Sequence, residues 1–174
     1  MVKKVTTPLS DDCIKDLRAG DIVLLSGRIL VARDAAHKRL VAAMQAGEAP
    51  FEVRDETIFY AGPAPTPPGA VIGPIGPTTS YRMDPYTPYL LEHGLKGMIG
   101  KGRRSPEVLE AIKKNTAVYF GATGGTSVLL ASAVVSAEKV AYEDLGPETV
   151  LRLEVKDMPL VVLADCHGGN LYKC

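Results

Sequence analysis

Three basic side chains and two hydroxyls in this sequence follow short apolar runs, where a functional site can form. The cations are Arg33, Arg82 and Lys101, and the hydroxyls belong to Thr78 and Thr79. A guanidinium matches a carboxylate with two parallel hydrogen bonds, whereas a lysine ammonium is a mobile point charge. Ligands of open α/β sheets bind beyond the carboxyl ends of the strands, where loop amides and helix N-termini face them. If these turns share one rim, the five residues form a pocket for a small, multiply charged carboxylate or phosphate.

Each of these features also has a simpler structural interpretation. An arginine at a strand end is more often a solvated surface charge, and residues 76–79 can form a turn with a capping threonine. The glycine-rich run 121–126 is similar to an anion loop but lacks the Lys-Ser/Thr ending of a P-loop, so close packing against a helix is its favoured role. His37, expected on the exposed or capping side of a helix, and His93, beside a helix-ending glycine, are interpreted as structural.

Several complete catalytic sets are missing from the sequence. It contains no GxSxG motif, which argues against a serine hydrolase, and no pair of carboxylates stands out either. Cys166 and His167 form one adjacent pair without a second pair at ligand spacing, which argues against zinc. The local patterns therefore predict an anion-binding α/β domain without a complete catalytic set.

The elements that must position these residues alternate between short apolar strands and helices. Strands are expected over 22–25, 29–32, 57–61, 98–99, 117–120, 151–155 and 160–164, with a turn or bulge between the first two. Helices are expected from Asp34 as N-cap to about Gly47, from about Asp84 to Gly94, after Ser105, and over about 126–136. These repeated strand, glycine turn and helix units favour an α/β fold with a mainly parallel central sheet and flanking helices.

Composition narrows the possible partners. The 174 residues, 46% of them hydrophobic, suit one compact domain. Twenty basic residues balance twenty acidic ones, so no global field favours nucleic acid or an anionic membrane. No run approaches the roughly 20 apolar residues of a membrane-spanning helix. Three widely spaced cysteines suit reduced thiols, and we therefore expect a soluble, cytoplasmic protein.

Four stretches, taken together and in order, resemble the C-terminal domain of class I fumarases. They are ARDAAHKR at 32–39, GPIGPTTSYRMD at 73–84, MIGKG at 98–102 and VKDMP at 155–159. The same domain forms the separate β subunit of two-chain fumarases and of L-tartrate dehydratase. The resemblance extends over about 20–168, which divides the single domain 1–174 into a lead-in segment 1–20, a fumarase β-type domain 21–168 and a tail 169–174.

What the resemblance implies is the β subunit of an iron-sulfur hydro-lyase that reversibly hydrates fumarate to malate. Its fold would be a swivelling β/β/α domain that closes over a four-iron four-sulfur cluster. Three cysteines of a partner α subunit would hold the cluster, so no metal ligand is expected in this chain and a hetero-oligomer is expected. The spacing of Cys13, Cys166 and Cys174 agrees, because it has no cluster-ligand pattern.

The resemblance also assigns roles to the candidate residues. Arg33 and Arg82 match the arginines that bind the substrate carboxylates, and Lys101 matches the lysine of the same pocket. Thr78 matches the threonine proposed to take the substrate proton, with Thr79 beside it as a binding hydroxyl. A neutral threonine is a weak base, and the sequence indicates no partner that would activate it.

Two alternatives remain open at this point. The stretches RDAAHK at 33–38 and MD at 83–84 look closer to fumarase, whereas DCHGGN at 165–170 looks closer to the tartrate enzyme. Fumarate and malate are therefore favoured over tartrate. The alternative from another class is a non-catalytic, anion-binding regulatory domain.

Overall fold

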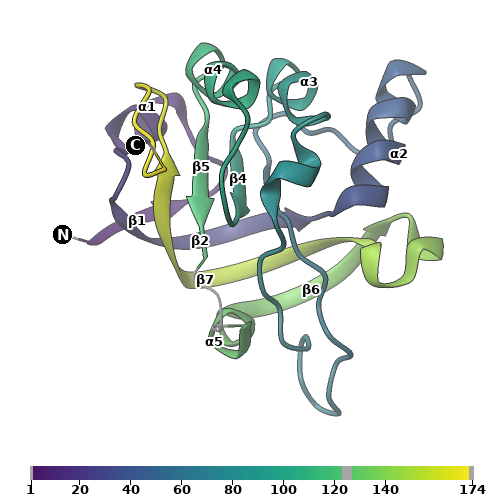
Figure 1. Cartoon of the computed structure of the whole chain (residues 1–174). Helices are drawn as coiled ribbons and strands as arrows, with labels where there is room; N and C mark the ends of the chain where they lie inside the picture. Colours follow the sequence, from purple (N-terminus) through teal and green to yellow (C-terminus); the bar gives the residue numbers. More distant parts are fainter. Residues whose placement is uncertain (1, 123–126, 173–174) are drawn as a thin grey trace.

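One sheet dominates the computed structural model, which describes residues 2–122 and 127–172. Within these residues seven strands follow the order β1-β2-β3-β4-β5-β7-β6, and β2 also pairs with β7. The sheet therefore closes into a barrel of β2, β3, β4, β5 and β7, with β1 and β6 as outer strands (Figure 1). The strands are β1 (Val2–Thr6), β2 (Ile22–Val31), β3 (Thr57–Phe59), β4 (Gly97–Gly100), β5 (Val118–Gly121), β6 (Val134–Ala141) and β7 (Val150–Ala164).

The pairing directions make this barrel mixed. The pairings that run from β1 through β2, β3 and β4 to β5 are all parallel. Strand β7 closes the barrel by running antiparallel to both β2 and β5, and β6 is antiparallel to β7. The predicted α/β class is confirmed, and the predicted parallel arrangement holds for the first five strands. The closure has no local sequence signal, because it pairs residues as distant as Ile22 and Val161.

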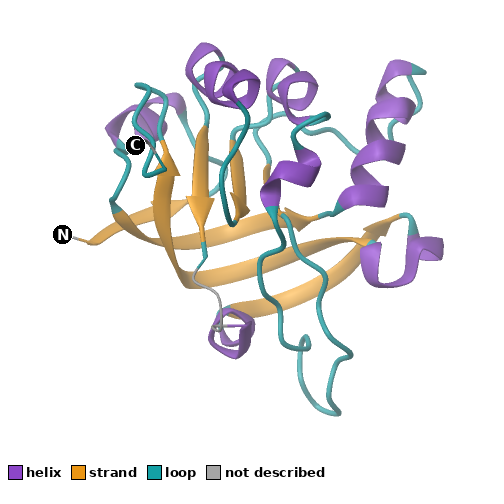
Figure 2. Cartoon of the chain, in the orientation of Figure 1, coloured by secondary structure: helices purple, strands orange, loops and turns teal. Residues whose placement is uncertain are grey.

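Helices cover the barrel mainly on one side. Helices α1 to α4 lie along that side, and α5 lies on the other (Figure 2). Helix α4 begins as predicted, with the Ser105 hydroxyl accepting from Val108 N at 3.3 Å. The α-helices are α1 (Asp11–Asp16), α2 (Asp34–Gln45), α3 (Thr87–Glu92), α4 (Pro106–Lys114) and α5 (Ser127–Ser132), and the 3-10 helices are η1 (Ser80–Met83) and η2 (Glu143–Glu148).

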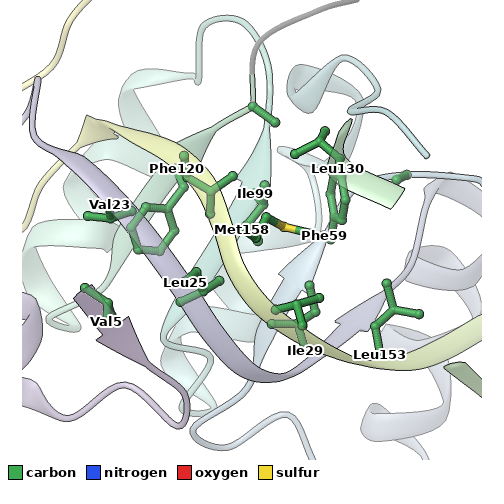
Figure 3. Packing of buried hydrophobic residues seen from close by; sticks show 14 of the residues in the cluster. Val5, Val23, Leu25, Ile29, Phe59, Ile99, Phe120, Leu130, Leu153 and Met158 are labelled. Atoms are coloured by element: carbon green, nitrogen blue, oxygen red, sulfur yellow. The ribbon is translucent and has the colours of Figure 1, made fainter. Parts of the chain in front are cut away.

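Two buried apolar clusters occupy the two faces of the sheet. Alternate residues of β2 enter different clusters, with Ile29 and Val31 in the first and Leu30 in the second. The first cluster fills the barrel, and part of it is drawn in Figure 3. The second lies under α2, α3 and α4, where Leu40 and Ile112 pack. Each fully buried large side chain of this kind contributes about 1.5–3 kcal/mol, which fixes the strand ends that carry the loops described below.

The segment before β2 contributes to the same core. Strand β1 pairs in parallel with β2 from Val2 opposite Ile22. Val5, Leu9 and Ile14 are buried in the barrel cluster. The division of the chain into a lead-in, a body and a tail stays a prediction.

Several predicted boundaries are wrong. The strands expected over 151–155 and 160–164 are the single strand β7. The helix expected from about Asp84 to Gly94 covers only Thr87–Glu92 and follows the 3-10 helix η1. The helix expected over 126–136 ends at Ser132, and β6 begins at Val134 because this segment pairs with β7. The two strands expected over 22–25 and 29–32 are one strand with a register shift between Leu25 and Gly27. Asp34 is the first residue of α2 rather than its N-cap, which is Arg33.

Candidate functional site

The residues predicted to form a site gather beyond the carboxyl ends of β2, β3 and β4. Arg33 lies two residues after β2. The Thr78 amide donates to the carbonyl of Tyr60, directly after β3, at 2.8 Å. Thr79 forms a parallel bridge with Lys101, the residue that follows β4. Three sequence segments therefore meet at one rim of the barrel.

One guanidinium links two of these segments. Arg82 Nε lies 3.3 Å from Asp34 Oδ2, and Arg82 Nη2 donates to Thr78 Oγ1 at 2.5 Å. The Arg82 and Asp34 side chains are each 38% exposed. An ion pair this exposed is worth only about 0–1 kcal/mol, so an incoming carboxylate can replace Asp34 as the partner of Arg82.

Arg33 lies at the N-terminus of α2, and one of its side-chain donors is left without an acceptor among the described residues. Its guanidinium passes over Gly62, where an added Cβ would lie 2.8 Å from Arg33 Nη1. Arg33 Nε is buried without a hydrogen-bond partner among the described residues. Glu148 Oε1 accepts from the Ala35 amide at 3.0 Å and so caps the first turn of α2 from η2. The backbone at Arg33 is therefore fixed, and the half-buried guanidinium has a hydrogen-bonding position, Nε, that the described residues leave unfilled.

Lys101 presents an exposed side chain from a fixed backbone. Its amide donates to Ser80 Oγ at 3.1 Å, and its carbonyl accepts from Ser80 N at 3.0 Å. Its ammonium has no salt-bridge partner within the described part of the chain. The rim thus carries the three cations Arg33, Arg82 and Lys101 against the carboxylates of Asp34 and Glu148, which leaves an excess of positive charge that suits an anion.

Beneath the rim lies a buried arginine that the sequence analysis missed. The Arg104 side chain is fully buried and donates to Asp84 Oδ1 at 2.7 Å, Thr87 Oγ1 at 2.9 Å and the Tyr60 hydroxyl at 3.2 Å. It also lies 4.8 Å from the centre of the Tyr119 ring. Burial opposes the charge, but Tyr60 and Asp84 raise the pKa of Arg104. No local pattern reveals this group, because its polar partners are 17 to 44 residues away.

The two histidines considered in the sequence have different positions. His37 is fully buried, which corrects the expectation that it lies on the exposed or capping side of α2. Its Nδ1 is 2.8 Å from the Arg33 carbonyl, and burial lowers its pKa to about 4. His93 is exposed after α3, with Nδ1 2.8 Å from the Tyr89 carbonyl. Both contacts are with backbone of their own helices, in keeping with structural roles.

The described residues do not fit a metal centre. Among them, no group of three His, Cys, Asp or Glu side chains could hold a metal ion. Cys13 and Cys166 are free, half-buried thiols, and Cys174 lies outside the described residues. Most of the glycine-rich run, residues 123–126, also lies outside them. No helix in the described ranges is long and apolar enough to cross a membrane.

Comparison with known proteins identifies several relatives. The family model described as "Fumarase C-terminus" matches residues 2–174. The aerobic class I fumarate hydratase of Escherichia coli K12 is 41% identical over 152 residues, which are 86% of this chain and 28% of that protein. Fumarate hydratase 2 of Leishmania major is 38% identical over 156 residues, with coverages of 88% and 28%. The chain thus spans just over a quarter of these two relatives.

A third relative is matched over most of its length. The L(+)-tartrate dehydratase subunit beta of Escherichia coli K12 is 35% identical over 176 aligned positions, which cover 98% of this chain and 87% of that subunit.

Proposed function

Because this chain belongs to the family of class I fumarase C-terminal domains, a hydro-lyase family, we propose that it supplies the substrate-binding half of an enzyme that interconverts fumarate and malate. The observation that carries this proposal is the rim that brings Arg33, Arg82 and Lys101 to the same end of the barrel as Thr78 and Thr79, with Arg82 bonded to the Thr78 hydroxyl. Its excess positive charge suits the two carboxylates of either compound.

Binding and orientation of the substrate are the first task of this rim. Arg82 would exchange Asp34 for one substrate carboxylate while keeping its hydrogen bond to Thr78. Arg33, whose buried Nε has no partner among the described residues, and Lys101 would bind the other carboxylate. Charge-assisted and bidentate bonds of this kind fix both position and orientation.

Proton transfer is the second task. Dehydration of malate requires removal of a proton from the methylene carbon and loss of hydroxide from the neighbouring carbon. We assign the proton to Thr78 Oγ1 in its alkoxide form, so that the transfer leaves a neutral hydroxyl; this oxygen accepts a hydrogen bond from Arg82 Nη2. A cationic donor stabilises the anionic form of a hydroxyl, so Arg82 is the activating partner that the sequence alone does not indicate. Thr79 would serve as a binding hydroxyl.

The remaining half of the site is assigned to a partner α subunit that carries the four-iron four-sulfur cluster. The absence of a metal-binding group in the described residues and the match to 87% of a tartrate dehydratase β subunit support this division. Departure of hydroxide is therefore not assigned to any residue of this chain. Closure of this domain over the partner, by the swivelling expected for the family, would complete the site and exclude water.

Fumarate and malate are proposed ahead of tartrate. The identity to the fumarate hydratases is 41% and 38%, against 35% for the tartrate dehydratase β subunit. The second candidate, a tartrate dehydratase β subunit, is favoured by the coverage of that relative. A pocket that hydrogen-bonds one extra substrate hydroxyl can discriminate strongly, so activity assays separate the two.

Anaerobic co-expression with an α subunit that carries three cluster cysteines tests the proposal. The reconstituted complex should hydrate fumarate and dehydrate malate, with weaker turnover of tartrate. Preferential turnover of tartrate would transfer the proposal to the second candidate. Dicarboxylate binding by a complex that turns over none of the three compounds would support a non-catalytic, anion-binding regulatory domain instead.

A further inference from the structure

We propose that Ser80 and Tyr119 are positioning residues that act through Lys101. This inference deepens the proposed function and rests on it, because it assigns a role to side chains that do not reach the substrate. Ser80 is fully buried and Tyr119 is 1% exposed, so both lie beneath the rim rather than on it.

A directed chain of hydrogen bonds connects these residues to Lys101. The Lys101 amide donates to Ser80 Oγ at 3.1 Å, and Ser80 Oγ lies 2.8 Å from the Tyr119 hydroxyl. The Tyr119 hydroxyl is also 2.8 Å from the Gly102 carbonyl, which can only accept. Tyr119 must therefore donate to Gly102 and accept from Ser80. These hydrogen bonds hold the backbone at the Lys101 amide and at the carbonyl of the next residue, Gly102.

Arg104 stabilises the Tyr119 end of this series of hydrogen bonds. Its guanidinium lies 4.8 Å from the Tyr119 ring centre, while its bond to Asp84 joins the loop after η1 to the loop after β4. The other oxygen of Asp84 accepts from Ser105 N at 2.8 Å. A shift of the Tyr119 ring would therefore disturb a buried cation that is bonded to Asp84, Tyr60 and Thr87, which is costly in a low-dielectric interior.

The close approach of Ser80 to β4 depends on Gly100. A Cβ added to Gly100 would overlap Ser80 Oγ and would lie 2.9 Å from the Tyr60 ring. The backbone just before Lys101 is thus shaped to admit the Ser80 hydroxyl. Packing alone does not require a hydroxyl at this point, whereas holding the Lys101 amide does.

The exposure of Lys101 explains why its backbone needs these hydrogen bonds. Its long side chain projects from a short loop and has no partner within the described residues to hold it. Only a fixed backbone can limit where its ammonium goes. Because a misplacement of about 1 Å at a site can lower the rate about 100-fold, loss of either hydroxyl should affect turnover without removing a charge.

The test uses Tyr119→Phe and Ser80→Ala in the reconstituted enzyme, each alone and combined with Lys101→Ala. Each hydroxyl deletion should lower kcat/KM for malate about 10-fold or more when Lys101 is present, and less than about 2-fold when Lys101 is alanine. Equal losses in both backgrounds would overturn the proposal. Tyr142→Phe is the matched control, because it removes a buried hydroxyl that has no hydrogen-bond partner among the described residues, and it should leave kcat/KM unchanged.

A second measurement on the free chain separates this inference from the proposed function. Hydrogen exchange of the Lys101 amide should be roughly 10-fold faster in Tyr119→Phe, while amides of β4 and β5 keep their protection. Unchanged exchange at Lys101 would overturn the inference whatever the enzyme does. If the wild-type complex lacks activity on malate, fumarate and tartrate, the proposed function fails, and the exchange result still decides whether the hydroxyls hold Lys101.

Discussion

At the scale of single residues, Arg82 connects the sequence motif to the proposed chemistry. It is bonded to both Asp34 and Thr78, so one side chain can exchange Asp34 for a substrate carboxylate and also polarise the Thr78 hydroxyl. The arginine, lysine and threonine types were open to sequence analysis because each follows a short apolar run, although Arg82 lies in the 3-10 helix η1 rather than after a strand. Arg104 and Tyr119 were not, because nothing local distinguishes a buried polar group from a surface one.

Replacement of Arg33 or Arg82 by lysine tests the role of the planar guanidinium. Lysine keeps the charge but loses the paired donors, so kcat/KM for malate should fall roughly 10²- to 10³-fold in the reconstituted enzyme. Arg39→Lys is the control, because Arg39 lies on α2 but pairs with Asp144 outside the rim. Near-normal kinetics in either rim variant would remove that arginine from the carboxylate site.

Thr78→Val separates proton transfer from binding. Valine keeps the β-branched shape and removes the hydroxyl, so the fold should persist. If Thr78 takes the proton, the variant should still bind malate but lose both turnover and exchange of the methylene hydrogen with deuterated water. Thr79→Val should instead weaken affinity, with exchange following occupancy. Near-normal exchange in saturated Thr78→Val enzyme would exclude Thr78 as the base.

His37 should make stability depend on pH. Burial lowers its pKa from 6.5 to about 4, so the unfolded chain takes up a proton in this window that the folded protein does not. The stabilisation that comes from neutral, buried His37 is complete above pH 6.5. The free energy of unfolding should fall by roughly 3 kcal/mol as the pH drops to 4. Urea denaturation should give a flatter profile for His37→Asn, which keeps a donor near the Arg33 carbonyl. Parallel profiles would show that another group is responsible.

At the scale of elements, local patterns predicted most helices and strands but not their partners. The capped start of α4 was readable from Ser105 and Pro106 because the cap lies within four residues. The first residues of β6, up to Ser136, were predicted as the end of a helix, since only the pairing of this strand with β7 determines its state. The η2 segment was also missed, although it reaches the site through Glu148.

Glu148→Ala should weaken the junction between η2 and α2. The lost acceptor leaves the Ala35 amide unpaired at the helix start, which typically lowers the free energy of unfolding by about 0.5–2 kcal/mol. Because Arg33 precedes this turn, its position should also loosen, and the KM for malate should rise. Glu143→Ala, an exposed change in the same 3-10 helix, should alter neither the urea midpoint nor KM. A similar loss in both variants would mean that the cap contributes nothing specific.

At the scale of the whole molecule, a closed barrel presents one rim whose loops carry the candidate residues. Closure by β7 ties β2 to β5, so the ends of β2, β3 and β4 keep fixed relative positions. Such a body is suited to move as a unit against a partner. The family resemblance in the sequence indicated the rim residues. The barrel could not be predicted from periodicity, because antiparallel closure depends on contacts between distant segments.

The cysteines of this chain provide the last prediction, which concerns where the iron is held. The proposal places every cluster ligand on the α subunit, so the chain purified alone should contain no stoichiometric iron and show no hydratase activity. A variant with all three cysteines changed to serine should reconstitute with unchanged iron content and kcat. Cys13 packs against the barrel cluster, so some loss of thermal stability is expected and is measured separately. Replacement of one cluster cysteine in the α subunit is the matched control and should abolish activity. Loss of iron from the complex of the cysteine-free chain would instead place a ligand in this chain and would contradict the division of the site.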